Sequence, residues 1–182
     1  MDTAKKANPA PLGLLGFGMT TILLNIHNAG LIELNIMIAA MGFALGGAAQ
    51  IIAGLLEFKQ GNTFGGTAFT AYGLFWWSLV LIWWNPLGLE KADSLSMGFY
   101  LLVWGLFTAF MFIGALKHNT ITKIVFGSLA VLFFTLAIGD FAQNDVIAVI
   151  AGVIGILCGL FAFYSAVGQI VNNEFGKKIF PL

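Results

Sequence analysis

The sequence predicts an all-α membrane protein, a bundle of six transmembrane helices with both chain termini on the same side of the membrane. Of the 182 residues, 59% are apolar and only 9% are charged, and none is arginine. A soluble domain carries about 25% charged residues, so the surface of this chain is too poor in charge for water. The mean hydropathy is +0.94, and each apolar stretch approaches the roughly 20 residues that a helix needs to cross a bilayer.

The apolar runs are separated by short polar breaks that carry turn-forming residues, such as Asn28-Ala29-Gly30 and Asn85-Pro86-Leu87-Gly88. These breaks leave no room for an inserted soluble domain, so residues 1–182 are expected to form a single six-helix transmembrane domain. The runs predict helices at residues 12–28, 34–56, 64–84, 96–116, 121–139 and 146–171.

The first helix is preceded by the stretch Asn8-Pro9-Ala10-Pro11. The two prolines fix φ and lack an N–H donor, so they fit the first turn of a helix, and Asn8 is the predicted N-cap. The unpaired amides at this helix start could attract an anion, or Asn8 could simply seal them. The spacing alone favours the seal.

The lysines predict the orientation of the bundle. Only Lys91 falls on the side opposite the N-terminus, whereas seven lysines fall on the same side: Lys5, Lys6, Lys59, Lys117, Lys123, Lys177 and Lys178. The positive-inside rule then places both termini in the cytoplasm and the protein in the cytoplasmic membrane. The first apolar segment continues into a helix of membrane length, so no cleaved signal is expected.

Polar side chains recur at helical spacing along three of the predicted helices, which indicates faces turned toward protein or a water-filled path. For a single Ser or Thr on such a face, packing is favoured over ligand contact. Gln50 fits a path role equally well because its amide can make four hydrogen bonds. The three faces contain Phe17, Thr20, Thr21, Leu24 and Asn28; Gly46, Gln50, Gly54 and Glu57; and Cys158, Ala162, Ser165, Gln169 and Asn172.

Two ionisable residues lie near helix ends. Glu57 falls near the cytoplasmic end of the second helix, where the helix dipole disfavours an anion. We therefore expect it to have a partner, such as Lys5, Lys59 or the amides that start another helix. His27, beside Asn25 and Asn28 near the outer end of the first helix, is expected in a vestibule rather than as a proton carrier.

Small residues at four-residue spacing predict close helix packing and an oligomer. They include Ala151-Gly155-Gly159 and Gly42-Gly46. With Cys158 as the only cysteine, no internal disulfide or thiolate metal cluster is expected. The scattered lysines make no basic patch for nucleic acid, and no carboxylate pair or histidine cluster indicates an enzyme.

Several segments carry a resemblance to a known family. They are Asn8-Pro9-Ala10-Pro11-Leu12-Gly13-Leu14, Gly16-Phe17-Gly18, Gly47-Ala48-Ala49-Gln50, and Asn62-Thr63-Phe64 through Thr67 to Gly73. The chain resembles the acetate uptake transporter family, also called succinate/acetate permeases. The resemblance implies a homo-hexamer in the lipid membrane, with a separate path through each protomer for acetate and, in some members, succinate. It also implies that Phe17, Tyr72 and Leu129 form an apolar constriction midway along the path, and that Ala162 bears on substrate size.

These observations lead to the hypothesis that the chain transports acetate without a cofactor, either as a channel or coupled to protons. The residues expected to line the path or bind substrate are Asn8, Thr20, Asn25, Asn28, Gln50, Glu57, Ala162, Ser165 and Gln169. Because no cation is predicted at membrane depth, the sequence leaves open whether acetic acid or the anion crosses. Two rival functions also stay open, a channel for a neutral solute such as urea or ammonia and a membrane scaffold or sensor.

Overall fold

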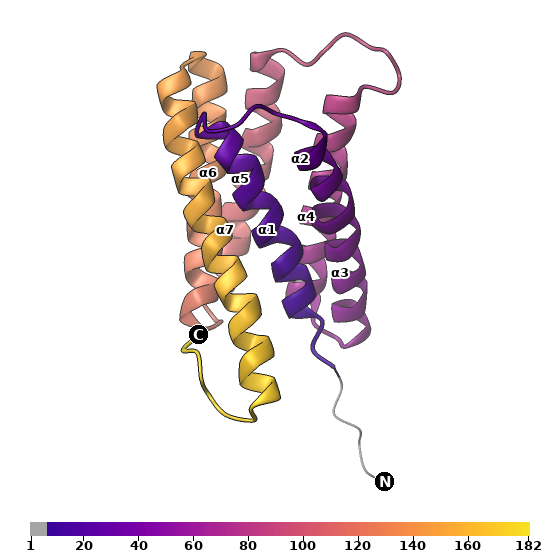
Figure 1. The fold of residues 1–182 in the computed structure, drawn as a ribbon, viewed down its shortest axis with the longest axis vertical. Coiled ribbons are helices and arrows are strands. Elements are labelled where there is room, and N and C mark those ends of the chain that lie inside the picture. The colour runs from indigo at the N-terminus through magenta and orange to yellow at the C-terminus, as the bar shows by residue number, and fades with distance from the viewer. Residues whose placement is uncertain (1–6) are drawn as a thin grey trace.

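The computed structural model describes residues 7–182, and Figure 1 shows a bundle of helices. Within residues 7–182, six helices are long and apolar enough to cross a membrane, as predicted. The second of them is continuous over residues 36–59 but is divided into three elements, α2, η1 and α3. All helix ends lie within three residues of those predicted. The elements are α1 Ala10–Asn28, α2 Ile36–Met41, η1 Gly42–Ala49, α3 Gln50–Lys59, α4 Thr63–Trp84, α5 Ser94–Ala115, α6 Thr120–Ala142 and α7 Asp145–Glu174.

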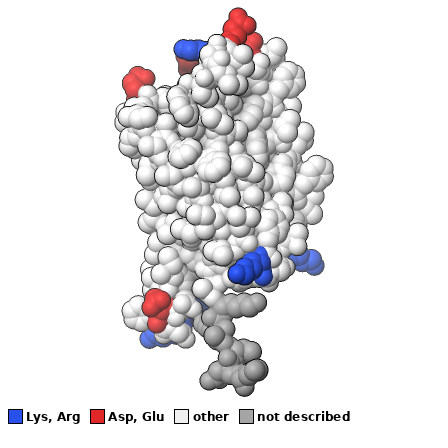
Figure 2. Space-filling view, turned by 90° about the vertical axis from the view of Figure 1, so that its right-hand side faces the viewer, with Lys and Arg blue, Asp and Glu red and all other residues white. Residues whose placement is uncertain are grey.

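The helices alternate in direction, so the described chain begins and ends at the same end of the bundle (Figure 1). We call this the terminal end and the opposite one the distal end. α1 lies between two groups of helices, packing against α7 on one side and against η1 and α3 on the other. On the face drawn in Figure 2, the charged side chains lie at the two ends, and an uncharged band separates them. Lys5 and Lys6 lie outside the described residues.

Side chains cap most of the helix starts. Asn35, Asn62, Asp93, Asn119 and Asn144 each accept a hydrogen bond from a backbone N–H in the first turn of the helix that follows. At α1 the prediction is off by one residue. Pro9 already has helical dihedral angles and occupies the N-cap position, and its carbonyl accepts from the N–H of Leu12 at 3.1 Å. Asn8 stands one residue earlier, and its Oδ1 accepts from the N–H of Ala10 at 3.1 Å.

The π-helical segment η1 departs from the regular helix expected for the second span. The indole Nε1 of Trp77 donates to the carbonyl oxygen of Phe43 at 2.9 Å, inside this segment. The same indole lies where a Cβ on Gly47 would stand, and Trp76 packs against Gly46. Each i→i+5 turn accommodates one more residue than an α-turn, and the glycines let both tryptophans contact the backbone directly. Hydrophobic periodicity carries no signal for this change.

α1 and α7 touch backbone to backbone. A Cβ on Gly18 would lie 2.8 Å from the nitrogen of Phe163 and 2.9 Å from the carbonyl oxygen of Gly159. Farther along the same contact, the side chain of Asn25 occupies the space where Gly155 lacks one. The glycine face predicted on the sixth span is therefore a helix-packing surface, and α1 is its partner.

The Gly18 contact predicts the effect of adding one methyl group. Gly18→Ala should lower the free energy of unfolding by about 1–3 kcal/mol relative to Gly139→Ala, because the new Cβ would overlap backbone atoms that cannot rotate away. Gly139 is the matched control, since its Cβ would meet its nearest atom at an ordinary 3.4 Å and both substitutions favour helix equally. Equal unfolding midpoints of the two variants in detergent would refute the claim that the backbones are in contact.

Candidate functional site

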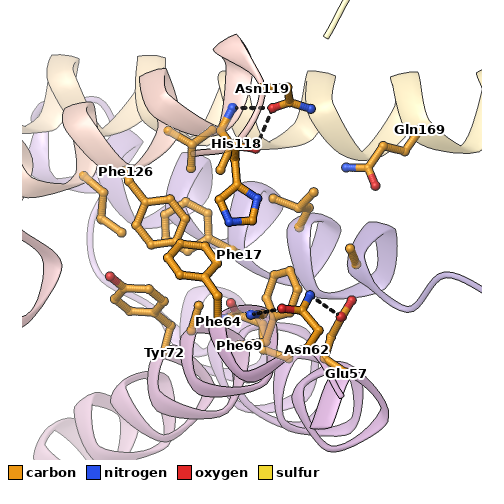
Figure 3. A pocket seen from close by; sticks show the side chains of 18 residues that line it. Phe17, Glu57, Asn62, Phe64, Phe69, Tyr72, His118, Asn119, Phe126 and Gln169 are labelled. Carbon is orange, nitrogen blue, oxygen red and sulfur yellow. Dashed lines mark hydrogen bonds between the residues drawn. The ribbon is translucent and has the colours of Figure 1, made fainter. Parts of the chain in front are cut away.

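A cavity of about 210 Å³ opens at the terminal end of the bundle (Figure 3). Residues from α1, α3, α4, α6 and α7 and from the loops before α4 and α6 line it. They are Ala10, Leu14, Phe17, Gln50, Glu57, Asn62, Phe64, Gly65, Ala68, Phe69, Tyr72, His118, Asn119, Thr122, Val125, Phe126, Leu129 and Gln169.

The cavity reaches about halfway along the helices. α4 begins at Thr63 and α6 at Thr120, both at the terminal end. Tyr72 and Leu129 each lie nine residues farther along, which is about 14 Å at 1.5 Å per residue. Together with Phe17 they form the deep wall, and all three side chains are buried. The three residues expected at an apolar constriction are thus together at the bottom of one cavity.

The ring of Tyr72 is held from outside the cavity. Its hydroxyl lies 3.0 Å from Oγ1 of Thr108, and Thr108 donates its own hydrogen to the carbonyl oxygen of Trp104 at 2.7 Å. The tyrosine hydroxyl is therefore the donor of the shared bond. This bond turns the polar end of Tyr72 toward α5 and leaves the ring near Phe17, with 6.2 Å between the ring centroids. Tyr72 thus presents a hydrocarbon surface to the cavity.

Gln50 supplies polarity to the cavity wall. Its Nε2 donates to the carbonyl oxygen of Gly46 at 2.8 Å. Its Oε1 is buried and has no hydrogen-bond partner among the described residues. Because Gln50 lines the cavity, this unsatisfied acceptor lies within the cavity wall.

Glu57 has a partner at the start of another helix, and this partner is the Asn62 side chain and not the backbone amides that were expected. Its Oε2 accepts from Nδ2 of Asn62 at 2.6 Å, and Oδ1 of Asn62 accepts from the N–H of Gly65 at 3.0 Å. The carboxylate therefore lies against the start of α4, where the helix dipole favours an anion. Within residues 7–182 no lysine pairs with Glu57; Lys5, the other expected partner, lies outside that range.

Asn8 and Gln169 meet at the rim of the cavity. Nδ2 of Asn8 donates to Oε1 of Gln169 at 2.9 Å, and Nε2 of Gln169 donates to Oγ of Ser165 at 3.3 Å. This short chain of hydrogen bonds joins the segment before α1 to the last turns of α7. Asn8 therefore fixes the rim as well as the helix start.

Other residues expected along the path lie outside the cavity wall. Thr20 donates to the carbonyl oxygen of Gly16, one turn earlier in its own helix, at 2.5 Å. Asn25 donates to the carbonyl oxygen of Thr21 at 2.8 Å and accepts from Asn28 at 3.1 Å. Ala162, Ser165 and His27 are also outside it. Ala162 and Ser165 are buried, and Nδ1 of His27 lies 2.9 Å from the carbonyl oxygen of Ile32 in the loop between α1 and α2.

The structure also brings in residues that sequence analysis missed, notably His118, Asn119 and Phe64. The His118 ring stacks on Phe64, with 4.5 Å between centroids and an interplanar angle of 29°. These residues lie in a loop or at a helix start, where the analysis of helix faces does not apply. The available signal was the position of one of only two histidines directly before a capping asparagine.

Comparisons with known proteins agree with this architecture. The sequence model of the GPR1/FUN34/yaaH family matches residues 1–179. The succinate-acetate/proton symporter SatP of Escherichia coli (strain K12) is 55% identical over 184 residues, covering 100% of this chain and 98% of that protein. Acetate permease A of Emericella nidulans is 31% identical, covering 100% of this chain and 67% of that protein.

The fold also matches a solved structure described as that of the bacterial acetate channel SatP. The TM-score is 0.96 at 54% sequence identity, and the match covers 98% of this chain and 99% of the other. The named relatives are a symporter, a permease and a channel, and none of these names describes an enzyme. By sequence and by fold, the chain belongs to the GPR1/FUN34/yaaH family.

Proposed function

We propose that this protein transports acetate, and with it other small carboxylates such as succinate, along a path inside each protomer. The observation that carries the proposal is the cavity that enters from the terminal end and stops at Phe17, Tyr72 and Leu129. The names of the relatives, a succinate-acetate/proton symporter, an acetate permease and an acetate channel, point to the same class of substrate.

The three apolar side chains act as a size and polarity filter. A hydrated ion would have to lose its water against hydrocarbon, whereas the methyl group of acetate gains contact with the same surfaces. Gln50, Glu57 and Gln169 line the part of the path that leads to this ring, and Asn8 holds its rim. Thr20, Asn25, Asn28, Ala162 and Ser165 support it by packing α1 and α7.

The carboxylate crosses the ring together with a proton. Among the buried residues of the described chain, Glu57 is the only charged one, and it lies toward the terminal end. A bare carboxylate at the ring would therefore have no cation beside it, which is costly at membrane depth. Gln50 lines the cavity and its Oε1 has no partner among the described residues, so we propose this amide as the acceptor for the O–H of the neutral acid.

Both termini are proposed to face the cytoplasm, and the protomer is proposed to form a hexamer. The orientation rests on the positive-inside rule, since Lys59, Lys117, Lys123, Lys177 and Lys178 all lie at or beyond the ends of the helices at the terminal end. The hexamer rests on the family resemblance. Large apolar side chains exposed on the sides of the bundle suit contact with lipid or with neighbouring protomers.

Reconstituted vesicles test the proposed path. Tyr72→Ala and Phe17→Ala should each increase the uptake of butyrate relative to acetate by about tenfold, because the ring widens where the larger acid must pass. Phe110→Ala is the control, since Phe110 is 73% exposed on α5 and does not line the cavity. The readout is the initial rate of radiolabelled acid uptake by protein that elutes as a single folded species.

The same vesicles separate the alternatives. If the wild-type protein moves urea or ammonia but leaves acetate at the rate of protein-free lipid, the chain is a neutral-solute channel. A folded protein that moves none of these solutes would support a scaffold.

Electrical recording tests the accompanying proton. In a planar bilayer, an acetate gradient should drive no current attributable to the protein, while acetate uptake carries protons that a trapped pH dye detects. An acetate-dependent current that reverses at the acetate equilibrium potential would show that the anion crosses alone.

Cysteine labelling tests the orientation. A cysteine introduced by Lys178→Cys should be protected from a membrane-impermeant maleimide in intact cells. One introduced by Ala92→Cys, in the loop between α4 and α5 at the distal end, should react. The native Cys158 is buried, so it should add little background. The opposite labelling pattern would place the terminal end outside the cytoplasm.

A further inference from the structure

We infer that His118 is the residue that binds the incoming carboxylate at the mouth of the cavity, and that its protonation makes this binding dependent on pH. This inference rests on the proposed function. It assigns an entry site to a residue that lies before α6, some distance from the apolar ring. The observations that carry it are the position of the imidazole, the charges around it and the hydrogen-bond donors beside it.

The imidazole is held in the mouth by aromatic packing. It stacks on Phe64, whose ring lies 5.2 Å from that of Phe126. Phe126 in turn lies 6.2 Å from Tyr72 in the deep wall. Figure 3 shows the His118 ring turned into the cavity beside Phe64 and on the same side as Phe17. A row of aromatic faces therefore leads from His118 to the apolar ring.

The position of His118 matters because few of the side chains that line the cavity can carry a charge. Of the residues that line the cavity, only Glu57, Tyr72 and His118 are ionisable. The Tyr72 hydroxyl is bonded to Thr108 and faces α5, and Glu57 places a carboxylate on the cavity wall. An entering carboxylate is repelled by Glu57, and among the described lining residues His118 is the side chain that can provide an opposite charge.

Within the part of the chain that the structure describes, the neighbouring elements contribute no other charged side chain to the cavity lining. α4 presents Phe64 to the imidazole, and α7 presents Gln169 to the cavity. The nearest lysines in the chain, Lys117 beside His118 and Lys123 in the first turn of α6, do not line it. Protonation of His118 therefore adds a positive charge to the one lining side chain, among residues 7–182, that can balance Glu57.

A second donor stands beside the imidazole. Oδ1 of Asn119 accepts from both the N–H and the hydroxyl of Thr122, at 3.0 and 2.6 Å. Its Nδ2 makes no hydrogen bond within residues 7–182, so it is free to donate. An imidazolium N–H and this amide together would give a carboxylate two donors, one of them charged.

A spectroscopic titration tests the contact without depending on transport. Imidazole side chains change charge between about pH 5 and 8. In the intact protein in detergent, labelled at histidine, excess acetate should raise the NMR titration midpoint of His118. The midpoint of His27 should stay fixed, because that ring lies at the distal end of α1, next to the carbonyl oxygen of Ile32. Chloride at equal ionic strength is the control for salt.

Transport kinetics test the consequence. In vesicles, the apparent KM for acetate should rise as the pH at the terminal face is raised from 5.5 to 7.5. His118→Phe keeps a ring on Phe64 but removes the charge. It should raise the KM at pH 5.5 by about threefold to tenfold and leave kcat within twofold. The part of the rise in KM with pH that depends on His118 in the wild type should be absent from this variant. His118→Gln should behave in the same way, and His27→Gln should match the wild type.

The outcomes distinguish this inference from the proposed function. Acetate transport with an unmoved His118 midpoint and a wild-type pH profile in His118→Phe would overturn the role of His118 and leave transport intact. If the wild-type protein moves no acetate at any pH, the proposed function fails. The NMR titration then decides alone, since a shifted midpoint still establishes carboxylate binding and an unshifted one overturns it.

Discussion

The close approach of α1 to two helices at once is the constraint on which the site depends. Gly16 and Gly18 flank Phe17, and each lets the backbone of α1 touch a different neighbour. A Cβ on Gly16 would lie 2.5 Å from the carbonyl oxygen of Leu45 in η1, and one on Gly18 would meet α7. Since the flanking glycines occupy these two directions, the side chain of Phe17 points between them, toward Tyr72 and the cavity. The apolar ring is thus a consequence of helix packing.

Polarity is distributed along the cavity in a way that matches a carboxylic acid. At the mouth, Asn8 and Gln169 join the segment before α1 to α7, and the Nδ2 of Asn119, the residue after His118, is left as a donor. Deeper, Gln50 provides an unused acceptor, and the bottom is hydrocarbon. At the mouth, where water is present, this order of surfaces gives a carboxylate an opposite charge and hydrogen-bond partners. Deeper in the cavity, where the molecule must pass quickly, it meets only weak contacts. No cation lies at the ring among residues 7–182, and the proposed proton would neutralise the acid there.

Asn62 illustrates how one side chain serves two elements. It caps α4 with its oxygen and holds the buried carboxylate of Glu57 with its nitrogen. Glu57 lies in the last turn of α3, whose dipole disfavours an anion there, but the start of α4 supplies the compensating field. The acid therefore stays on the cavity wall without a lysine partner within residues 7–182, and this unbalanced charge is the reason that His118 matters for an entering anion.

The number of membrane helices, their ends to within three residues, and the family were all predicted correctly from the order of the amino acids. Each of these depends on local information: the length of an apolar run, the turn residues between runs, and short motifs such as Asn8 to Leu14. The resemblance also identified Phe17, Tyr72 and Leu129 as a group, and these three do lie together. The side-chain cap expected of Asn8 was only one residue out, because Pro9 already has helical geometry.

Only the tertiary structure decided which polar side chains reach the cavity. Thr20 and Asn25 share a helix face with Phe17, but contacts with their own backbone and with α7 occupy them. The Trp77 bond that accompanies the π-helical turn, the pairing of Glu57 with Asn62, and the stacking of His118 on Phe64 each join groups from different elements. A periodic pattern describes one helix at a time, whereas these contacts depend on how two helices are placed against each other. For that reason they became visible only in three dimensions.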